Sequence, residues 1–234
     1  MRGCCLTKKN NDKMKLNNIS LKSVLPVVFR GSEGEEPVAS SEVWLREEVR
    51  FERPEAYIIE AESGTGKSSL CAYIYGARTD YDGTIEMDGR DIRTLGIDDW
   101  CELRRTQLAY LPQEMRLFGE LTVMENIEVK NALTGFLTHD EIMERLRELE
   151  LDGKASRKAA QLSVGQQQRV AIVRALCQPF SFLLIDEPVS HLDARNNAAV
   201  AAMIAREAAR QEASVIATSV GNKISLPSFR LLNL

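Results

Sequence analysis

One segment constrains the fold of this chain more than any other. Residues 61–68 read Ala-Glu-Ser-Gly-Thr-Gly-Lys-Ser and match the phosphate-binding pattern G-x-x-x-x-G-K-S/T except at its first position. The apolar residues 56–59 before this segment predict a buried strand, and residues 69–74 after it predict a helix. A loop between a strand and a helix directs backbone N–H groups toward phosphate oxygens. The segment therefore predicts an α/β fold with a phosphate-binding loop.

The phosphate loop predicts a site for ATP and Mg²⁺. Its glycines permit a close backbone approach, the lysine adds charge for the β- and γ-phosphates, and the serine hydroxyl is expected to ligate Mg²⁺. The residues expected to bind nucleotide here are Ser63, Gly64, Thr65, Gly66, Lys67, Ser68 and Ser69, with Ser68 as the metal ligand and Lys67 also acting in catalysis. Ala61 replaces the first glycine of the pattern, which predicts an altered entry to the loop but an intact site.

A second chemical motif follows the apolar run of residues 180–185, which predicts a buried parallel strand. Asp186 and Glu187 come directly after it. Ligands bind at the carboxyl ends of strands in open α/β sheets, so we expect both acids beside the phosphate loop. Asp186 is the predicted Mg²⁺ ligand, and Glu187 is the predicted general base for an attacking water.

Further motifs follow in a fixed order. Leu111-Pro112-Gln113 comes first, residues 162–166 read Leu-Ser-Val-Gly-Gln, and residues 190–193 read Ser-His-Leu-Asp. Together with the two motifs above, they make the chain resemble the nucleotide-binding subunit of an ABC transporter, nearest the lipoprotein-release and macrolide-export group. The resemblance implies a P-loop NTPase fold: a RecA-like core sheet, an antiparallel β subdomain, and an inserted α-helical subdomain at about residues 97–178 within a domain of residues 14–234.

The resemblance assigns roles to residues outside the phosphate loop. It implies that Gln113 senses Mg²⁺ and the γ-phosphate, acts in catalysis and contacts a membrane partner. Ser163, Gly165 and Gln166 would bind the ATP that is held by the other subunit of a dimer, and Ser163 also fits a helix N-cap. Asp193 would communicate between the two sites.

The resemblance also implies an aromatic side chain that stacks on adenine. Phe29, at the end of an apolar run, is the candidate by position, and Trp44 is the alternative.

Two departures from the family pattern bear on turnover. Val164 replaces a glycine, which adds a β-branched side chain near the partner's phosphate. Ser219 stands where the family ends a strand with a histidine that bridges the γ-phosphate and the catalytic glutamate. The leading interpretation is an ATPase that dimerises on ATP, as a homodimer or heterodimer, and drives a separate permease. The alternative is a regulatory subunit that binds nucleotide with little hydrolysis; a phosphate-loop kinase leaves residues 162–166 unexplained.

Composition bounds the remaining expectations. A net charge of −4 favours no nucleic-acid partner, and 5 cysteines without metal-ligand spacing suit reduced cytosolic thiols. No stretch approaches the roughly 20 apolar residues of a membrane-spanning helix, so we expect a cytoplasmic protein held at the inner face of the membrane by its permease. Residues 1–13 are polar and basic, which predicts a disordered tail with Met14 as an alternative start. Asp82-Gly83 and Asp88-Gly89 predict turns on either side of a strand.

Overall fold

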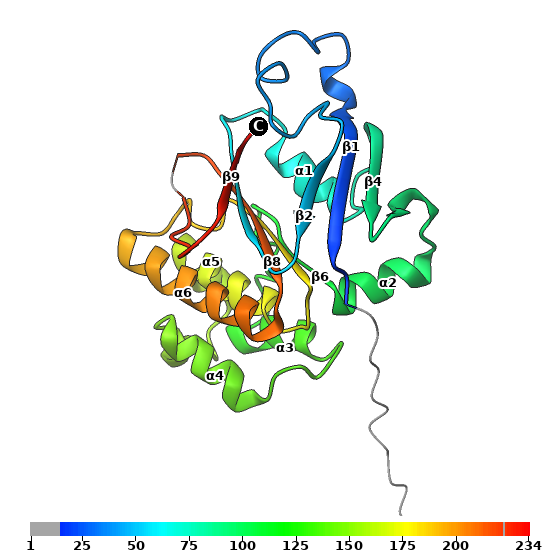
Figure 1. Cartoon of the computed structure of the whole chain (residues 1–234). Helices are drawn as coiled ribbons and strands as arrows, with labels where there is room; N and C mark the ends of the chain where they lie inside the picture. Colours follow the sequence, from blue (N-terminus) through cyan, green and yellow to red (C-terminus); the bar gives the residue numbers. More distant parts are fainter. Residues whose placement is uncertain (1–14, 222) are drawn as a thin grey trace, which may run out of the picture.

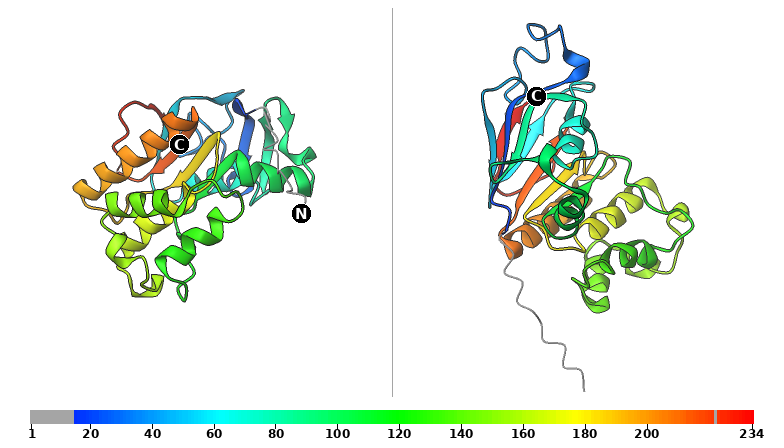
Figure 2. Two further views of the ribbon diagram at one scale, coloured as in Figure 1. Left: turned by 90° about the horizontal axis from the view of Figure 1, so that it is seen from below. Right: turned by 90° about the vertical axis from the view of Figure 1, so that its right-hand side faces the viewer.

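The computed structural model describes residues 15–221 and 223–234 (Figure 1). The predicted disordered tail at residues 1–13 and the alternative start at Met14 lie outside the described residues. A parallel sheet forms the centre of the molecule, with an antiparallel sheet beside it and a group of helices at another side (Figure 2). This arrangement is the predicted P-loop NTPase fold with its antiparallel β subdomain and helical insertion.

The parallel sheet has the strand order β6-β7-β8-β3-β9. Its strands are β3 (Ala56–Glu60), β6 (Leu108–Leu111), β7 (Phe182–Asp186), β8 (Ser214–Ser219) and β9 (Arg230–Asn233). Every residue of β7 and of β8 is buried, because helices or the second sheet cover both faces. Since the strands run parallel, their carboxyl ends meet at one edge, and the chain segments that follow β3, β7 and β8 lie there together.

The antiparallel sheet has the order β2-β1-β4-β5. Its strands are β1 (Asn18–Pro26), β2 (Val49–Glu52), β4 (Tyr81–Met87) and β5 (Arg90–Asp91). The predicted turn at Asp82-Gly83 is wrong, because both residues belong to β4. Gly83 has φ +82°, and a side chain there would lie 2.3 Å from the carbonyl oxygen of Ser23, where the register with β1 shifts. Glycine at this position serves a β-bulge.

The longer helices cover both sheets. They are α1 (Lys67–Ile74), α2 (Ile97–Thr106), α3 (Val123–Asn131), α4 (His139–Glu148), α5 (Val164–Ala175) and α6 (Ala194–Gln211). Single 3₁₀ turns occur at Val27–Phe29, Ile92–Thr94, Asp152–Lys154 and Ala159–Gln161. Thr122, Thr138 and Ser163 cap α3, α4 and α5 with reciprocal capping boxes, which explains why each helix begins where it does.

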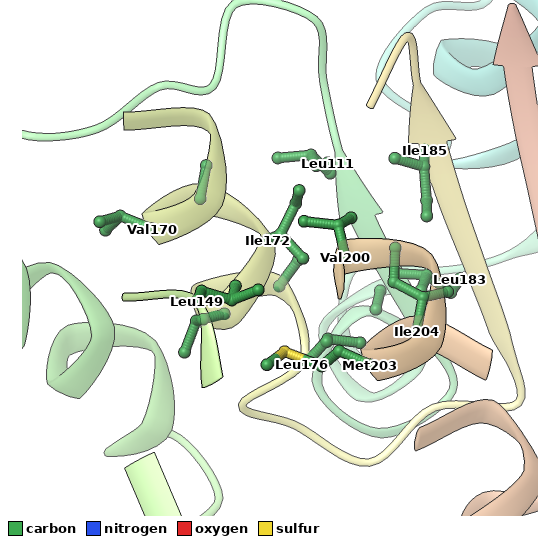
Figure 3. Packing of buried hydrophobic residues seen from close by; sticks show 14 of the residues in the cluster. Leu111, Leu149, Val170, Ile172, Leu176, Leu183, Ile185, Val200, Met203 and Ile204 are labelled. Carbon is green, nitrogen blue, oxygen red and sulfur yellow. The ribbon is translucent and has the colours of Figure 1, made fainter. Parts of the chain in front are cut away.

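Two hydrophobic clusters lie on opposite faces of the parallel sheet, because successive side chains of a strand alternate in direction. Leu183 and Ile185 of β7 face the cluster beneath α5 and α6, where Ile172, Val200 and Ile204 join them (Figure 3). Phe182 and Leu184 face the cluster that contains the antiparallel sheet and α1. The sheet is therefore held from both sides, which fixes the position of its carboxyl edge.

The helix-rich range 97–178 contains one strand of the core, since β6 pairs with β7 at the end of the parallel sheet. Helices α3 and α4 pack against α5. A buried ion pair adds a polar link between α4 and α6: Arg145 donates to Glu207 at 2.8 Å, and Arg210 contacts the same carboxylate at 2.9 Å. The helices therefore join the core through apolar packing and through one buried carboxylate.

Candidate functional site

The phosphate loop connects β3 to α1 at the carboxyl edge of the parallel sheet. Gly64 and Gly66 have φ +88° and +98°, a region that other residues enter only with strain. Lys67 is buried, and its ammonium donates to the carbonyl oxygens of Ala61, at 3.2 Å, and of Glu62. Thr65 Oγ1 also donates to Glu62 O at 3.0 Å. The carbonyl of Ala61 accepts from Lys67, and the altered entry to the loop with an intact site remains a prediction.

Two aromatic side chains lie against the phosphate loop. Trp44 is buried, and its indole N–H donates to the carbonyl oxygen of Thr65 at 3.0 Å. A Cβ built on Gly66 would lie 3.1 Å from the Trp44 ring and 3.5 Å from the Phe29 ring. Burial leaves the Trp44 ring no free face, which disfavours it as the adenine-stacking residue. Phe29 is half-buried beside the loop and remains the prediction for that role.

The acidic residues after β7 lie next to the end of β8. Asp186 is 2% exposed, and its Oδ1 accepts a hydrogen bond from Thr218 Oγ1 at 2.6 Å. The same hydroxyl oxygen accepts from the backbone N–H of Glu187 at 3.2 Å. Glu187 has φ +51°, an uncommon conformation that costs free energy in a residue with a side chain. Thr218 therefore orients both acids, a role that we did not predict from the sequence.

Charged and polar side chains from three elements meet at this edge. Gln113, after β6, donates through Nε2 to Glu187 Oε2 at 3.3 Å. Burial lowers the pKa of Lys67, and the nearby carboxylates of Glu187 and Asp186 partly oppose this effect. Burial raises the pKa of Cys71, in the first turns of α1, well above its usual value, and the charge of Asp186 adds to the effect. The buried Cys71 thiol in α1 therefore stays neutral.

The donor set at this edge suits Mg²⁺. Within residues 15–221 and 223–234, no group of three or more His, Cys, Asp or Glu side chains comes together in a metal-binding arrangement. The side chains predicted as ligands offer a hydroxyl, an amide carbonyl and a single carboxylate, which are Ser68, Gln113 and Asp186. Mg²⁺ accepts oxygen ligands of this kind and takes the rest of its shell from phosphate and water. These residues would hold Mg²⁺ only together with a bound nucleotide.

A second group of predicted residues lies at the start of α5. Ser163 accepts a hydrogen bond from the N–H of Gln166 at 3.4 Å, and Gln166 Oε1 accepts from the N–H of Ser163 at 3.1 Å. Ser163 and Val164 are exposed. A Cβ on Gly165 would lie 3.0 Å from the carbonyl oxygen of His191, so glycine permits this close backbone approach. The dipole of α5 favours negative charge at this exposed N-terminus.

Residues 163–166 at the start of α5 are called the corner below. Gln168 connects this corner to the acidic residues. It is 3% exposed, its Nε2 donates to the carbonyl oxygen of Glu187 at 3.2 Å and to Ser190 Oγ at 3.4 Å, and its Oε1 accepts from the N–H of His191 at 3.3 Å. Asp193 caps α6 by accepting from the N–H of Asn196, which lowers its pKa. Like Thr218, Gln168 is absent from the sequence prediction, because a lone polar residue inside a helix gives no signal of its tertiary partners.

Ser219, the last residue of β8, is 3% exposed. Its carbonyl oxygen accepts from the N–H of Ala61 at 3.2 Å, which ties β8 to the start of the phosphate loop. A cavity of about 740 Å³ adjoins the loop on this side and is lined by residues of the loop, of the end of β8 and of the chain end. The structure thus brings the predicted residues into two groups, one at the sheet edge and one at the start of α5.

A phosphate loop after β3, an acid pair at the end of β7 and a helical insertion with a capped α5 define a P-loop NTPase cassette. The comparison with known families agrees: the family described as "ABC transporter" matches residues 47–190. The chain belongs to the ABC transporter family. The predicted resemblance to ABC nucleotide-binding subunits near the macrolide-export type is confirmed.

Individual relatives support this assignment. The macrolide export ATP-binding/permease protein MacB of Vibrio parahaemolyticus is 34% identical over 160 residues, which are 67% of this chain and 24% of MacB. The trimethylamine N-oxide transport system ATP-binding protein TmoW of Pelagibacter ubique is 37% identical over 142 residues, 59% of this chain and 42% of TmoW. The chain therefore spans about a quarter of the length of the MacB relative that it matches.

Solved structures agree with the fold. A dimeric structure of the ATP-binding cassette MJ0796 in a post-hydrolysis state bound to ADP and Pi has a TM-score of 0.67 and 25% identity, and the match covers 86% of this chain and 87% of that one. Among the residues that the structure describes, none of the helices has the length and apolar character needed to cross a membrane.

Proposed function

We propose that this chain is the ATP-hydrolysing subunit of a membrane transport complex and that it works as an ATP-dependent dimer. The observation that carries the proposal is the contact between Gln113 and Glu187 beside Lys67 at one sheet edge. We assign Lys67 to phosphate binding, Glu187 to the general base and Gln113 to sensing the γ-phosphate. The dimeric MJ0796 cassette, bound to ADP and Pi, supports pairing. The proposed cofactors are ATP and Mg²⁺.

The proposed reaction is hydrolysis of the γ-phosphate bond. Lys67 and the phosphate-loop N–H groups hold the phosphates, and Glu187 accepts a proton from the attacking water. The water oxygen bonds to the γ-phosphorus, the bond to the β–γ bridging oxygen breaks, and ADP keeps that electron pair. The products are ADP and inorganic phosphate. Mg²⁺, when bound, supplies charge neutralisation of the phosphates.

The corner at Ser163 and Gly165 supports the proposal of a composite site. This anion-binding helix N-terminus is exposed, so a second subunit can reach it with its own bound ATP. In a two-fold head-to-tail dimer, each phosphate loop would face the partner's corner, and the interface would be isologous. Val164 would add an apolar contact there in place of a glycine.

A surface next to Gln113 fits contact with a permease. A cavity of about 270 Å³ lies between β6, α3 and α5 and is lined in part by Tyr110, Pro112, Phe118, Val129 and Leu133. Phe118, Val129 and Leu133 are exposed apolar side chains. A permease helix seated there would touch the segment that carries Gln113. The proposed location is therefore the cytoplasmic face of a membrane, with no nucleic acid as a partner.

ATP turnover with a matched pair of variants tests the proposal. The unmodified protein should hydrolyse ATP, and Glu187→Gln should lower hydrolysis by roughly 10²- to 10⁴-fold while ATP still binds. Glu114→Gln, an exposed neutralisation after the same strand as Gln113, is the control and should hydrolyse normally. Sedimentation of Glu187→Gln with ATP should show a dimer. ATP binding without Glu187-dependent hydrolysis would contradict the proposal and favour a regulatory nucleotide-binding subunit.

A further inference from the structure

The loop between β7 and α6 contains a histidine that the site described above does not use. The chain has 2 histidines. His139 begins α4, where its Nδ1 lies 3.6 Å from Glu128 Oε1, outside both groups of site residues. His191 lies in the loop that starts at Glu187 and ends at the cap of α6. His191 is therefore the histidine that lies near the candidate catalytic residues.

His191 lies directly beside the corner that is proposed to meet the partner's ATP. Its carbonyl oxygen would be 3.0 Å from a Cβ on Gly165, which is backbone contact. In the head-to-tail dimer, Gly165 approaches the γ-phosphate bound by the other subunit. His191 then enters the other subunit's site together with Gly165. This step rests on the proposed function.

The side chain of His191 is available for such a contact. The residue is exposed, and its Nδ1 lies 3.0 Å from Ser190 Oγ. This bond leaves Nε2, on the far side of the imidazole ring, directed away from Ser190. Ser219, which occupies the position of the family histidine, is 3% exposed and has a shorter side chain. The exposed imidazole is the better placed of the two to meet a phosphate that arrives at the surface.

Gln168 holds the backbone of the loop at two residues, Glu187 and His191. The single amide of Gln168 accepts from His191 N at 3.3 Å and donates to Glu187 O at 3.2 Å. The backbones of Glu187 and His191 therefore share one support. A fixed backbone limits the positions that the imidazole can take, and a donor positioned in advance needs little reorganisation when the charge on the phosphate changes.

We propose that His191 of one subunit donates a hydrogen bond from its imidazole to the γ-phosphate of the ATP bound by the other subunit. The donor to the γ-phosphate thus comes from across the dimer. The bond stabilises charge that develops on the phosphate oxygens, and it requires no proton transfer in addition to that from water to Glu187.

Single substitutions give the first test. His191→Ala should lower ATP turnover about a hundredfold and leave ATP affinity nearly unchanged, because it removes one donor to the transition state. His191→Gln keeps an N–H donor of similar reach and should retain part of the lost turnover. His139→Ala is the matched control and should hydrolyse ATP as the unmodified protein does.

Mixed dimers then locate the histidine. Two differently tagged chains are co-purified as heterodimers. When one subunit carries His191→Ala and the other carries Glu187→Gln, one site keeps its own Glu187 and receives His191 from the opposite subunit. This heterodimer should hydrolyse ATP. When both substitutions are in one subunit and the partner is unmodified, neither site has both groups, and turnover should be about a hundredfold lower than in the first heterodimer.

The opposite activity pattern would show that His191 acts within its own subunit and would overturn the inference. Unmodified turnover in the His191→Ala homodimer would also overturn it, while leaving the proposed ATPase function intact. If the unmodified protein binds ATP but shows no Glu187-dependent turnover, the proposed function and the inference both fail. The unmodified protein and the Glu187→Gln variant test the proposed function without any change at His191. The His191→Ala homodimer and the heterodimers then test the inference.

Discussion

The sheet edge that carries the phosphate loop and the corner at the start of α5 are built in different ways. At the edge, Lys67 and Asp186 are buried, and the strands that position them are covered on both faces. At the corner, Ser163 and Val164 are exposed, and the local structure depends on a helix cap and on the side chain of Gln168. In the proposed dimer, the edge holds ATP within one subunit, whereas the corner contacts the ATP of the partner subunit. Binding and turnover should therefore respond differently to substitutions in the two regions.

Glu187→Gln should give the largest effect. Loss of the general base should lower turnover by roughly 10²- to 10⁴-fold, while the phosphate loop still binds ATP. The measurement is steady-state phosphate release, together with ATP affinity from equilibrium binding. An equal loss of ATP affinity would show that Glu187 acts in ATP binding and not in the chemical step alone.

Breaking the buried ion pair between α4 and α6 should give the largest loss of stability. Glu207→Leu leaves Arg145 buried without its carboxylate and should lower the free energy of unfolding by about 3–5 kcal/mol. Urea denaturation measures this loss. Glu148→Leu removes an exposed partner of Arg206 and should cost no more than about 1 kcal/mol. Equal losses in the two variants would show that the helices depend on apolar packing alone.

Lys67→Ala should affect the edge by a smaller amount. Removal of one charged contact to the phosphates should cost about 1.5–3 kcal/mol of ATP binding, which is roughly a ten- to hundredfold loss of affinity. Lys158→Ala, which removes an exposed lysine paired with Glu120, is the charge-matched control. ATP affinity that is unchanged by Lys67→Ala would contradict the assigned phosphate site.

Ser163→Ala should give the smallest effect on stability, about 1 kcal/mol from the lost cap. The matched control is Thr138→Ala, which removes the same kind of cap from α4. The two variants should lose similar stability, but only Ser163→Ala should weaken ATP-dependent dimerisation. Dimerisation is measured by sedimentation with ATP. If the two variants dimerise equally, Ser163 acts as a helix cap and not in the dimer contact.

The sequence predicted the edge better than the corner. The strand before the phosphate loop and the strand before Asp186 were expected within one or two residues, because a buried parallel strand is a short continuous apolar run. The N-cap at Ser163 was also expected, since a cap depends on neighbouring residues. Local patterns therefore account for both features.

The missed features all depend on contacts between distant segments. Asp82-Gly83 looks like a turn locally, yet Gly83 lies in a strand because the backbone of Ser23 approaches it. Thr218 and Gln168 carry no motif, and only the fold brings them to Asp186 and Glu187. Trp44 lies against the phosphate loop and donates a hydrogen bond to the carbonyl of Thr65. Sequence patterns do not encode these tertiary neighbours.

The position of Trp44 gives the protein a built-in optical reporter. The chain has 2 tryptophans, and the indole of Trp44 both donates to the Thr65 carbonyl and packs against Gly66. Trp100 lies elsewhere, against Gly76 and beneath the guanidinium of Arg104. Any rearrangement of the phosphate loop therefore changes the surroundings of one indole and leaves those of the other. With Trp100→Phe as background, the emission spectrum of the unlabelled protein follows nucleotide arrival at the loop in real time.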